Sequence, residues 1–240
     1  MHQKEMLHLE ICKEPVDSKL YMFLAEAYKS ELNEKSAVEL LHILGQIRID
    51  AGETQSITDQ LQESLQQITA DPGKNLLPLG IEYMNIFRGT GPNPVFLYEA
   101  VHRSEEGLIF EAPYFEVKSC YEKSGFAAEP DWTDPEDHIS VECYFLDFLS
   151  EGIEQAHTND DLKQETFLQS QRDAFLQEHF LQWVPQFSEQ VIQNTSQDFY
   201  RQVGLLTRAI CKQVALNVDS PALNGLIKLG GNKDGNVKYE

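Results

Sequence analysis

The stretch Glu129-Pro-Asp-Trp-Thr-Asp-Pro-Glu-Asp-His138, which runs on into residues 139–152, contains the clearest helix start of the chain. Asp134 before Pro135 predicts that start, because a carboxylate caps a first turn and proline loses nothing there by lacking an N–H. A helix from Asp134 to Gly152 would expose a polar face made of Ser140, Tyr144, Asp147, Glu151 and Glu154. It would bury an opposite face made of His138, Glu142, Phe145, Leu149 and Ile153. An inward histidine and carboxylate one turn apart indicate either a functional site or a structural pair.

The composition bounds the class of protein. The chain has 240 residues, 41% of them apolar, and a formal net charge of −20. This length suits one domain or two small, closely packed ones. The charge disfavours nucleic acid and anionic membranes and favours basic partners, although it is also typical of a protein that is merely soluble. No run of 18 apolar residues is present, and residues 1–10 lack the features of a signal peptide, so we expect a cytoplasmic protein without a membrane span.

Apolar residues recur at helical spacing through most of the chain, which predicts an all-α bundle of about eight or nine helices. The first predicted helix begins at Asp17, and the others cover about residues 36–49, 57–70, 76–87, 113–124, 134–152, 160–183, 187–193 and 198–214. Asp71-Pro72-Gly73 is predicted to form a turn, and Pro185 to stop or kink a helix.

The helical pattern lapses between Arg88 and Ala112, where two glycines and two prolines fall within seven residues. We therefore expect an N-terminal helical half at residues 1–88, an irregular central loop at 89–112, a C-terminal helical half at 113–216 and a flexible tail at 217–240. The two halves would pack closely as one compact domain. A long central loop would also permit two copies to exchange halves, so a homodimer stays possible.

Motifs for enzyme chemistry are missing. The chain has no phosphate-binding GxxxxGK[ST], no GxGxxG, no GxSxG and no HExxH, and its four cysteines, at 12, 120, 143 and 211, lack metal or disulfide spacing. We expect no catalytic residues, no cofactor and no metal. One alternative is a dimetal carboxylate enzyme, because a glutamate precedes a histidine by three residues at Glu5/His8, Glu39/His42, Glu99/His102 and Glu154/His157.

Three segments together resemble the TorD/DmsD family of chaperones for molybdenum oxidoreductases. The first is YMNIFRGTGP at 83–92, followed by Tyr98-Glu99; the second is PEDH at 135–138 with Glu142; the third is HFLQWVPQF at 179–187, followed by Phe199-Tyr200. Two departures stand out. Asp134 takes the place of the family's glutamate, and Gly-Thr-Gly-Pro with Leu97-Tyr98 replaces the commoner Gly-Pro-Gly and Pro-Tyr.

The resemblance implies an all-helical, two-part fold with a hinge at residues 134–138. It also implies a non-enzymatic chaperone that binds the twin-arginine leader and apoprotein of a redox enzyme's catalytic subunit until the molybdopterin cofactor is inserted. The client, and whether guanine nucleotide binds, stay open. A further alternative is a helical scaffold for some other basic protein.

A twin-arginine leader is basic and then apolar, so its receptor should offer carboxylates beside an apolar groove. The residues expected to bind it are Trp132, Asp134, Glu136, Asp137, His138, Glu142, Tyr83, Phe87, Tyr98 and Glu99. Burial is an open alternative for Tyr83, Phe87 and Trp132 as core aromatics. It is also open for Asp137, and for a His138 bonded to Glu142. We assign His179 and Trp183 to the core.

Overall fold

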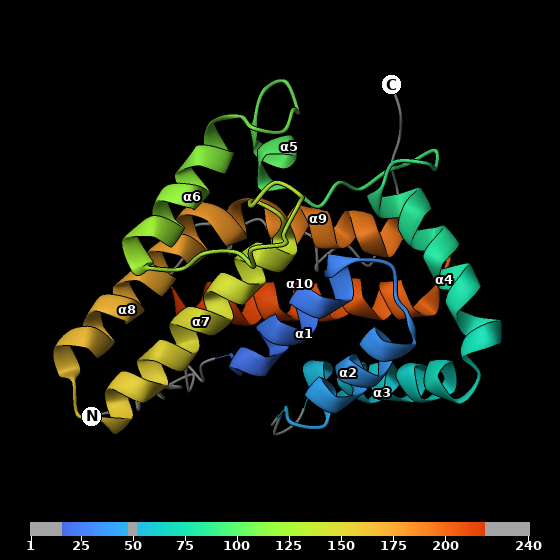
Figure 1. Ribbon diagram of the computed structural model, residues 1–240, viewed down its shortest axis with the longest axis horizontal. Coiled ribbons are helices and arrows are strands. Elements are labelled where there is room, and N and C mark those ends of the chain that lie inside the picture. Colours follow the sequence, from blue (N-terminus) through green and yellow to red (C-terminus); the bar gives the residue numbers. More distant parts are fainter. Residues whose placement is uncertain (1–15, 48–51, 219–240) are drawn as a thin grey trace, which may run out of the picture.

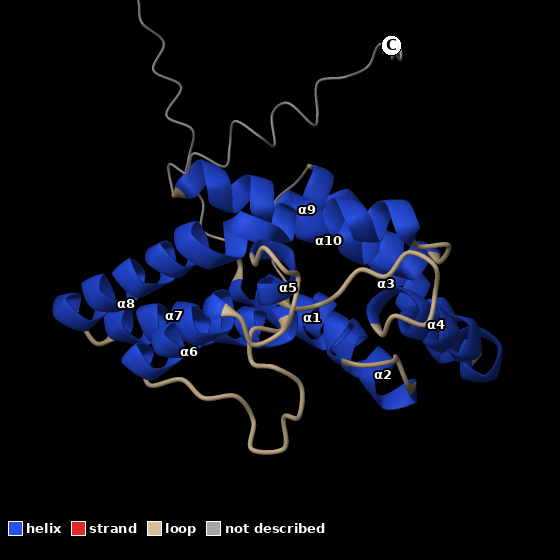
Figure 2. Ribbon diagram, turned by 90° about the horizontal axis from the view of Figure 1, so that it is seen from above, coloured by secondary structure: helices blue, strands red, loops and turns tan. Residues whose placement is uncertain are grey.

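The fold comes from a computed structural model that describes residues 16–47 and 52–218 (Figure 1). These residues form ten α-helices and one π-helical turn: α1 (Ser18–Lys29), α2 (Glu34–Leu44), α3 (Glu53–Ala70), α4 (Pro72–Phe87), α5 (Glu99–Arg103), α6 (Ala112–Ser124), α7 (Ile139–Thr158), α8 (Leu162–Phe175), η1 (Leu176–Phe180), α9 (Leu181–Asn194) and α10 (Asp198–Asn217). Within the same residues there is no strand (Figure 2), only an isolated antiparallel bridge between Tyr98 and His138. The prediction of an all-α fold is confirmed.

The core joins the early and the late helices of the chain. α1 packs against α7, and α10 packs against both α9 and α3, while α8 lies along α7. In Figure 1, α4 stands at one end of the molecule and α8 at the other, with α10 crossing between them. The buried apolar side chains of both halves therefore form a single cluster.

α7 begins at Ile139, so the predicted start at Asp134 is wrong. His138 is the N-cap, and its ring Nδ1 accepts a hydrogen bond from the backbone N–H of Ser140 at 3.0 Å. The residues before it form a turn, in which the His138 N–H donates to the Pro135 carbonyl at 3.2 Å. The chain around Tyr98 holds this turn in place, because the Ile139 N–H donates to the Leu97 carbonyl at 2.8 Å. A contact with a segment distant in the sequence, which the local sequence does not reveal, thus moves the N-cap by four residues, from Asp134 to His138.

The inward face of α7 is confirmed, with His138, Glu142, Phe145 and Leu149 buried. Its predicted polar face is only partly exposed. Ser140 and Asp147 are buried, because α1 crosses α7 on that side, and the Ser140 hydroxyl donates to the Ala25 carbonyl at 2.7 Å. The helix also continues past Gly152 to Thr158.

Several other boundaries differ from the prediction. The predicted turn at Asp71 is the start of α4, with Asp71 as its cap. The central segment contains a short helix, α5. α9 runs through Pro185 without stopping; Trp183, Val184 and Phe187 are buried around the proline and hold the helix despite the missing hydrogen bond. The irregularity lies upstream instead, in the π-helical turn η1.

Parts of the predicted organisation lie outside the described residues. These are residues 1–15 with Glu5/His8 and Cys12, and the tail beyond residue 218. The helix predicted at 36–49 ends within the described residues and earlier than expected, because α2 stops at Leu44 with Gly45 as its C-cap. In the described ranges, no helix is long and apolar enough to cross a membrane.

Candidate functional site

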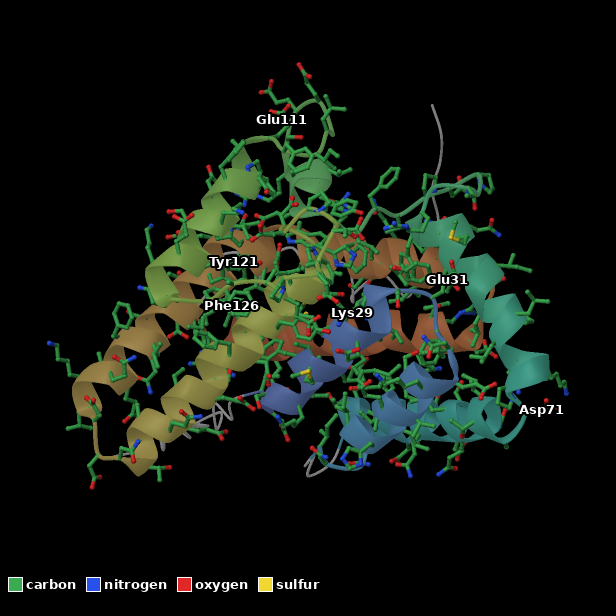
Figure 3. All side chains as sticks on the ribbon, viewed as in Figure 1. Lys29, Glu31, Asp71, Glu111, Tyr121 and Phe126 are labelled. Atoms are coloured by element: carbon green, nitrogen blue, oxygen red, sulfur yellow. The ribbon has the colours of Figure 1, made fainter. Side chains whose placement is uncertain are left out.

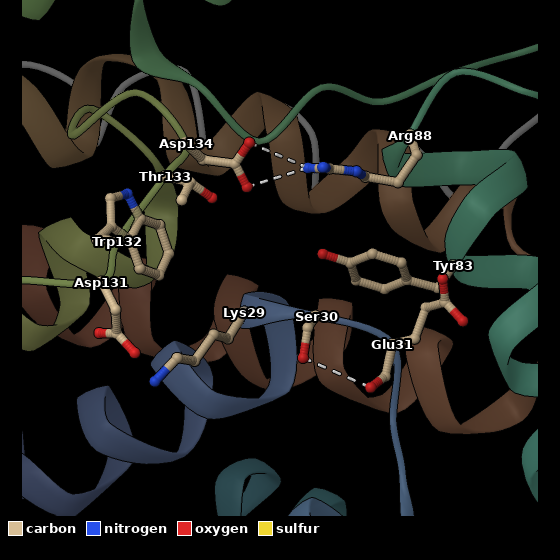
Figure 4. Close-up of a pocket in the computed structure, with 9 residues that line it drawn as sticks. All are labelled: Lys29, Ser30, Glu31, Tyr83, Arg88, Asp131, Trp132, Thr133 and Asp134. Carbon is tan, nitrogen blue, oxygen red and sulfur yellow. Dashed lines mark hydrogen bonds and ion pairs between the residues drawn. The ribbon is translucent and has the colours of Figure 1, made fainter. Parts of the chain in front are cut away.

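A hollow of about 340 Å³ lies where the end of α1, the end of α4 and the loop before α7 meet (Figure 4). Its lining residues are Lys29, Ser30, Glu31, Tyr83, Arg88, Asp131, Trp132, Thr133 and Asp134. Lys29 and Glu31, at and just beyond the end of α1, mark its position in the whole molecule in Figure 3. Residues about 100 positions apart in the chain thus face one another across this hollow.

Asp134 forms one wall of the hollow and is held by two partners. Arg88 Nη1 lies 3.1 Å and 3.3 Å from its two carboxylate oxygens, and the Tyr98 hydroxyl donates to Oδ1 at 3.2 Å. The Arg88 and Asp134 side chains remain 39% and 27% exposed. An external guanidinium can therefore reach the same carboxylate.

The other carboxylates of the hollow are free. Glu31 and Asp131 are exposed, and neither has an ion-pair partner among the described residues. Lys29, in contrast, pairs with Glu129 at 3.1 Å. Two of the three carboxylates that line the hollow, those of Glu31 and Asp131, are therefore available to bind a cation.

The side chains of Trp132, His138 and Tyr98 form a cluster of rings behind the hollow. The His138 ring lies edge-on to both Trp132 and Tyr98, with centroids 5.2 Å and 5.4 Å away. His138 is fully buried, and that burial lowers its pKa to about 3, so the ring is neutral. Its Nε2 atom, and the half-buried indole N–H of Trp132, have no hydrogen-bond partner among the described residues.

Asp137 caps α5, a helix that is distant from it in the sequence. Its Oδ2 accepts from the backbone N–H of Ala100 at 2.8 Å, and its carbonyl accepts from that of Glu99 at 3.0 Å. Both donors belong to the first turn of α5, whose N-cap residue, Tyr98, supplies no side-chain cap. Burial raises the pKa of Asp137 to about 6. Asp137 has no exposed surface and acts as the missing cap.

Glu99 and Glu142 lie deeper still, and both are fully buried. Glu142 accepts from the Trp183 indole N–H at 3.2 Å, so the pairing of Glu142 with His138 that we considered does not form. Burial and the nearby Glu99 carboxylate raise the pKa of Glu142. Glu99 pairs with Arg103 and with His179.

The remaining expected residues divide between core and surface. Tyr83 touches the hollow but is almost fully buried, and its hydroxyl donates to the Tyr28 carbonyl at 3.1 Å. Phe87 is buried against the Tyr28 ring, with centroids 5.7 Å apart. Glu136 is half-buried, pairs with Lys118 and faces a second hollow of about 410 Å³ on the other side of Trp132. His179 and Trp183 are buried, as assigned.

An apolar groove of about 550 Å³ adjoins the first hollow along α4, and Glu31 lines both. Leu77 and Ile81 project into it, 69% and 55% exposed. Apolar periodicity does not predict this groove, because these positions lie on the side of α4 away from the apolar stripe. The sequence likewise does not predict that Glu31 lines the hollow, because this depends on α1 ending beside residues 131–134.

The described residues contain no group of three or more His, Cys, Asp or Glu side chains that could hold a metal ion. Glu39, His42, Glu154 and His157 are exposed, and Glu99 pairs with His179 rather than with His102. The dimetal alternative therefore has no site within this part of the chain.

The described residues define an all-helical fold with a hollow lined by charged side chains, and comparison with known proteins identifies its family. Residues 48–189, more than half of the chain, match the family described as nitrate reductase delta subunit. The chain belongs to this family, which confirms the resemblance to the redox-enzyme maturation chaperones.

Its relatives support the same class. The chain is 26% identical over 206 residues to the chaperone protein TorD of Vibrio parahaemolyticus, covering 81% of this chain and 91% of that one. It is 25% identical to TorD of Aliivibrio fischeri, covering 76% and 83%. These relatives are chaperones rather than enzymes, as expected for this chain.

A solved structure has the same fold. It is described as a redox enzyme maturation protein from Archaeoglobus fulgidus, and it aligns with a TM-score of 0.52 at 19% identity, over 83% of this chain and 97% of that one. At this identity the likeness concerns the fold alone.

Proposed function

We propose that this chaperone binds the twin-arginine leader of a molybdopterin-dependent oxidoreductase subunit in the cytoplasm and holds the apoprotein back until its cofactor is inserted. The observation that carries the proposal is the hollow itself. It presents the free carboxylates of Glu31 and Asp131, and that of Asp134, beside an apolar groove. A leader offers the complementary order of groups, basic and then apolar.

The arginines of the leader bind in the hollow. A guanidinium matches a carboxylate with two parallel hydrogen bonds, a geometry that a lysine ammonium does not provide. Glu31 takes one arginine and Asp134 takes the other in place of Arg88, while Asp131 adds a third carboxylate on the side of the hollow opposite Glu31 (Figure 4). The Trp132 ring at the wall adds a face on which a guanidinium stacks.

The apolar segment of the leader lies along α4, against Leu77 and Ile81. Glu31 lies at the junction of hollow and groove, which sets the direction of the peptide. The bound peptide covers the exposed apolar side chains of Leu77 and Ile81 and removes them from water. This burial of apolar surface adds to the affinity that charge pairing provides.

The buried residues of the site act by positioning. Asp137 and His138 hold the chain at residues 134–138 against Tyr98, which in turn holds Asp134. Glu99 and Glu142 fix α5 and α9 behind this pair. Their substitution should weaken leader binding without removing a direct contact.

The test is calorimetric titration of the purified chain with a twin-arginine leader of a molybdoenzyme catalytic subunit, at low and at high salt. We expect binding that weakens with salt, and that weakens on the order of tenfold in Glu31→Gln/Asp131→Asn, the value of one or two charge-assisted hydrogen bonds. Glu63→Gln, an exposed acid on α3 away from the hollow, is the matched control and should bind as the original protein does.

Two further peptides separate the alternatives. A leader with Lys-Lys in place of Arg-Arg should bind more weakly, because it loses the bidentate geometry. A peptide of equal charge without the apolar segment should bind more weakly still. If that peptide binds as well as the leader, the protein is a general scaffold for basic partners and the proposal is overturned.

A further inference from the structure

Cys120, His179 and Glu99 form a chain of contacts behind the leader site. The Cys120 sulfur lies 3.6 Å from His179 Nε2, and His179 Nδ1 lies 3.0 Å and 3.2 Å from the two carboxylate oxygens of Glu99. The three residues come from α6, η1 and α5. A thiol, an imidazole and a carboxylate in this order make the arrangement that activates cysteine nucleophiles.

The imidazole is fixed on all sides. Glu99 holds one ring nitrogen and Cys120 contacts the other, while the Phe175 ring stacks on the imidazole face at 5.1 Å and 24°. The π-helical turn of η1 carries His179, and such turns often occur at functional sites. The ring is therefore held with Nε2 directed at the sulfur.

The surrounding charges favour a proton on His179. Burial lowers its pKa, but the hydrogen bonds to Cys120 and Glu99 outweigh burial and raise the pKa to about 9. Arg103 pairs with Glu99. The Glu99 charge also acts on the buried carboxyls of Asp137 and Glu142 and on the buried phenol of Tyr121, and helps to raise the pKa of each. A protonated imidazole at this contact can deliver its proton to a group that leaves when the sulfur reacts.

Of the three residues in the cluster, only the nucleophile Cys120 is partly accessible to solvent. Glu99 and His179 are buried, whereas Cys120 is half-buried and is unpaired with any other cysteine. Cys143 and Cys211, the other two cysteines in the described ranges, are fully buried in apolar surroundings. Cys120 thus differs from both in having a charged partner and partial access to solvent.

We propose that Cys120, His179 and Glu99 form a reactive-thiol site whose substrates are small peroxides. The Cys120 thiolate attacks one peroxide oxygen, so that an S–O bond forms and the O–O bond breaks. The leaving hydroxide takes the His179 proton and becomes water when the peroxide is hydrogen peroxide. Sulfur gives two electrons to the peroxide and becomes a sulfenic acid.

The test is the pH dependence of iodoacetamide alkylation, resolved by peptide mass spectrometry in the full chain. The matched control moves the thiol by one position, in Cys120→Ser/Ser119→Cys, where the half-buried Ser119 is on the same helix but has no recorded contact with His179. Between pH 6 and 8 the rate at position 120 should change by less than about threefold. The rate of the moved thiol should rise by roughly 50- to 100-fold, as for an ordinary cysteine.

A second measurement tests the peroxide reaction. After hydrogen peroxide treatment, a 1,3-cyclohexanedione probe should label Cys120 more than the moved thiol. Glu99→Gln, if folded by circular dichroism, should restore a rising pH profile. A wild-type profile that follows the moved thiol overturns the site, and a flat profile without sulfenic acid labelling overturns peroxide as its substrate.

Discussion

For single residues, the property that decides the site is which polar side chains remain exposed to solvent. Asp134 and Asp137 are three positions apart, yet one lines the hollow and the other is fully buried as the cap of α5. Local sequence assigned both to one acidic helix start. Their separation follows from the turn between them, in which the His138 N–H donates to the Pro135 carbonyl, and from the contact of Asp137 with the first turn of α5.

Arg88 provides a prediction at this scale, because it occupies the carboxylate that we assign to the leader. Arg88→Gln should increase leader affinity about two- to fivefold, since a partly exposed ion pair contributes up to about 1 kcal/mol. Calorimetric titration measures the change. Arg172→Gln, which breaks a similar surface pair with Asp173, should leave affinity unchanged; a loss of affinity in Arg88→Gln would contradict the competition.

His138 gives a second prediction, on pH. Its lowered pKa of about 3 keeps the ring neutral, with the proton on Nε2 because Nδ1 accepts from Ser140. The unfolded ring binds a proton below about pH 6.5 and the folded ring does not, so the contribution of His138 to stability is lost as pH falls from 6.5 toward 3. Nitrogen NMR between pH 4 and 8 should record one constant neutral tautomer. A ring that titrates near 6.5 would contradict this.

At the scale of elements, α5 depends on a cap from another part of the chain. α1 and α10 follow from apolar periodicity, but α5 has only five residues and little periodicity to predict it. Asp137 stabilises its first turn from 37 positions away. This is why the central segment looked irregular in the sequence although it contains an ordered helix.

Asp137→Ala tests that dependence. We expect a loss of about 1 kcal/mol of stability, faster hydrogen exchange at residues 99–103, and weaker leader binding through release of Tyr98. Because the raised pKa of about 6 makes the folded state lose stability as pH rises from about 4 to 6, Asp137→Asn should cost less than alanine at pH 7. Asp71→Ala, the cap of α4, is the control and should speed exchange in α4 alone.

At the scale of the whole molecule, the two predicted halves share one core. α1 and α3 pack against α7 and α10, so each half covers apolar surface of the other. The boundary near residue 89 is thus a boundary in the sequence pattern, and we propose that it does not divide the chain into independently folding units.

Thermal unfolding checks this proposal. The chain should unfold in a single transition with equal calorimetric and van't Hoff enthalpies. Leu24→Ala, a fully buried position in α1, should lower the midpoint of that one transition, at a cost of about 2–5 kcal/mol. Two separate transitions, in the original protein or the variant, would contradict a shared core. Val38→Ala, at an exposed position of α2, should leave the midpoint nearly unchanged.

The amino-acid sequence is enough to predict the all-α class, most helices, and the family through three spaced segments. The helices depend on contacts within a few turns of the chain, so apolar spacing and capping residues reveal them. Which carboxylates are free to bind a partner follows from the packing of distant segments, because burial of Asp137 and exposure of Asp131 depend on residues 30 to 100 positions away. For the same reason, the groove along α4 and the contact of Cys120 with His179 emerge only when distant helices pack together.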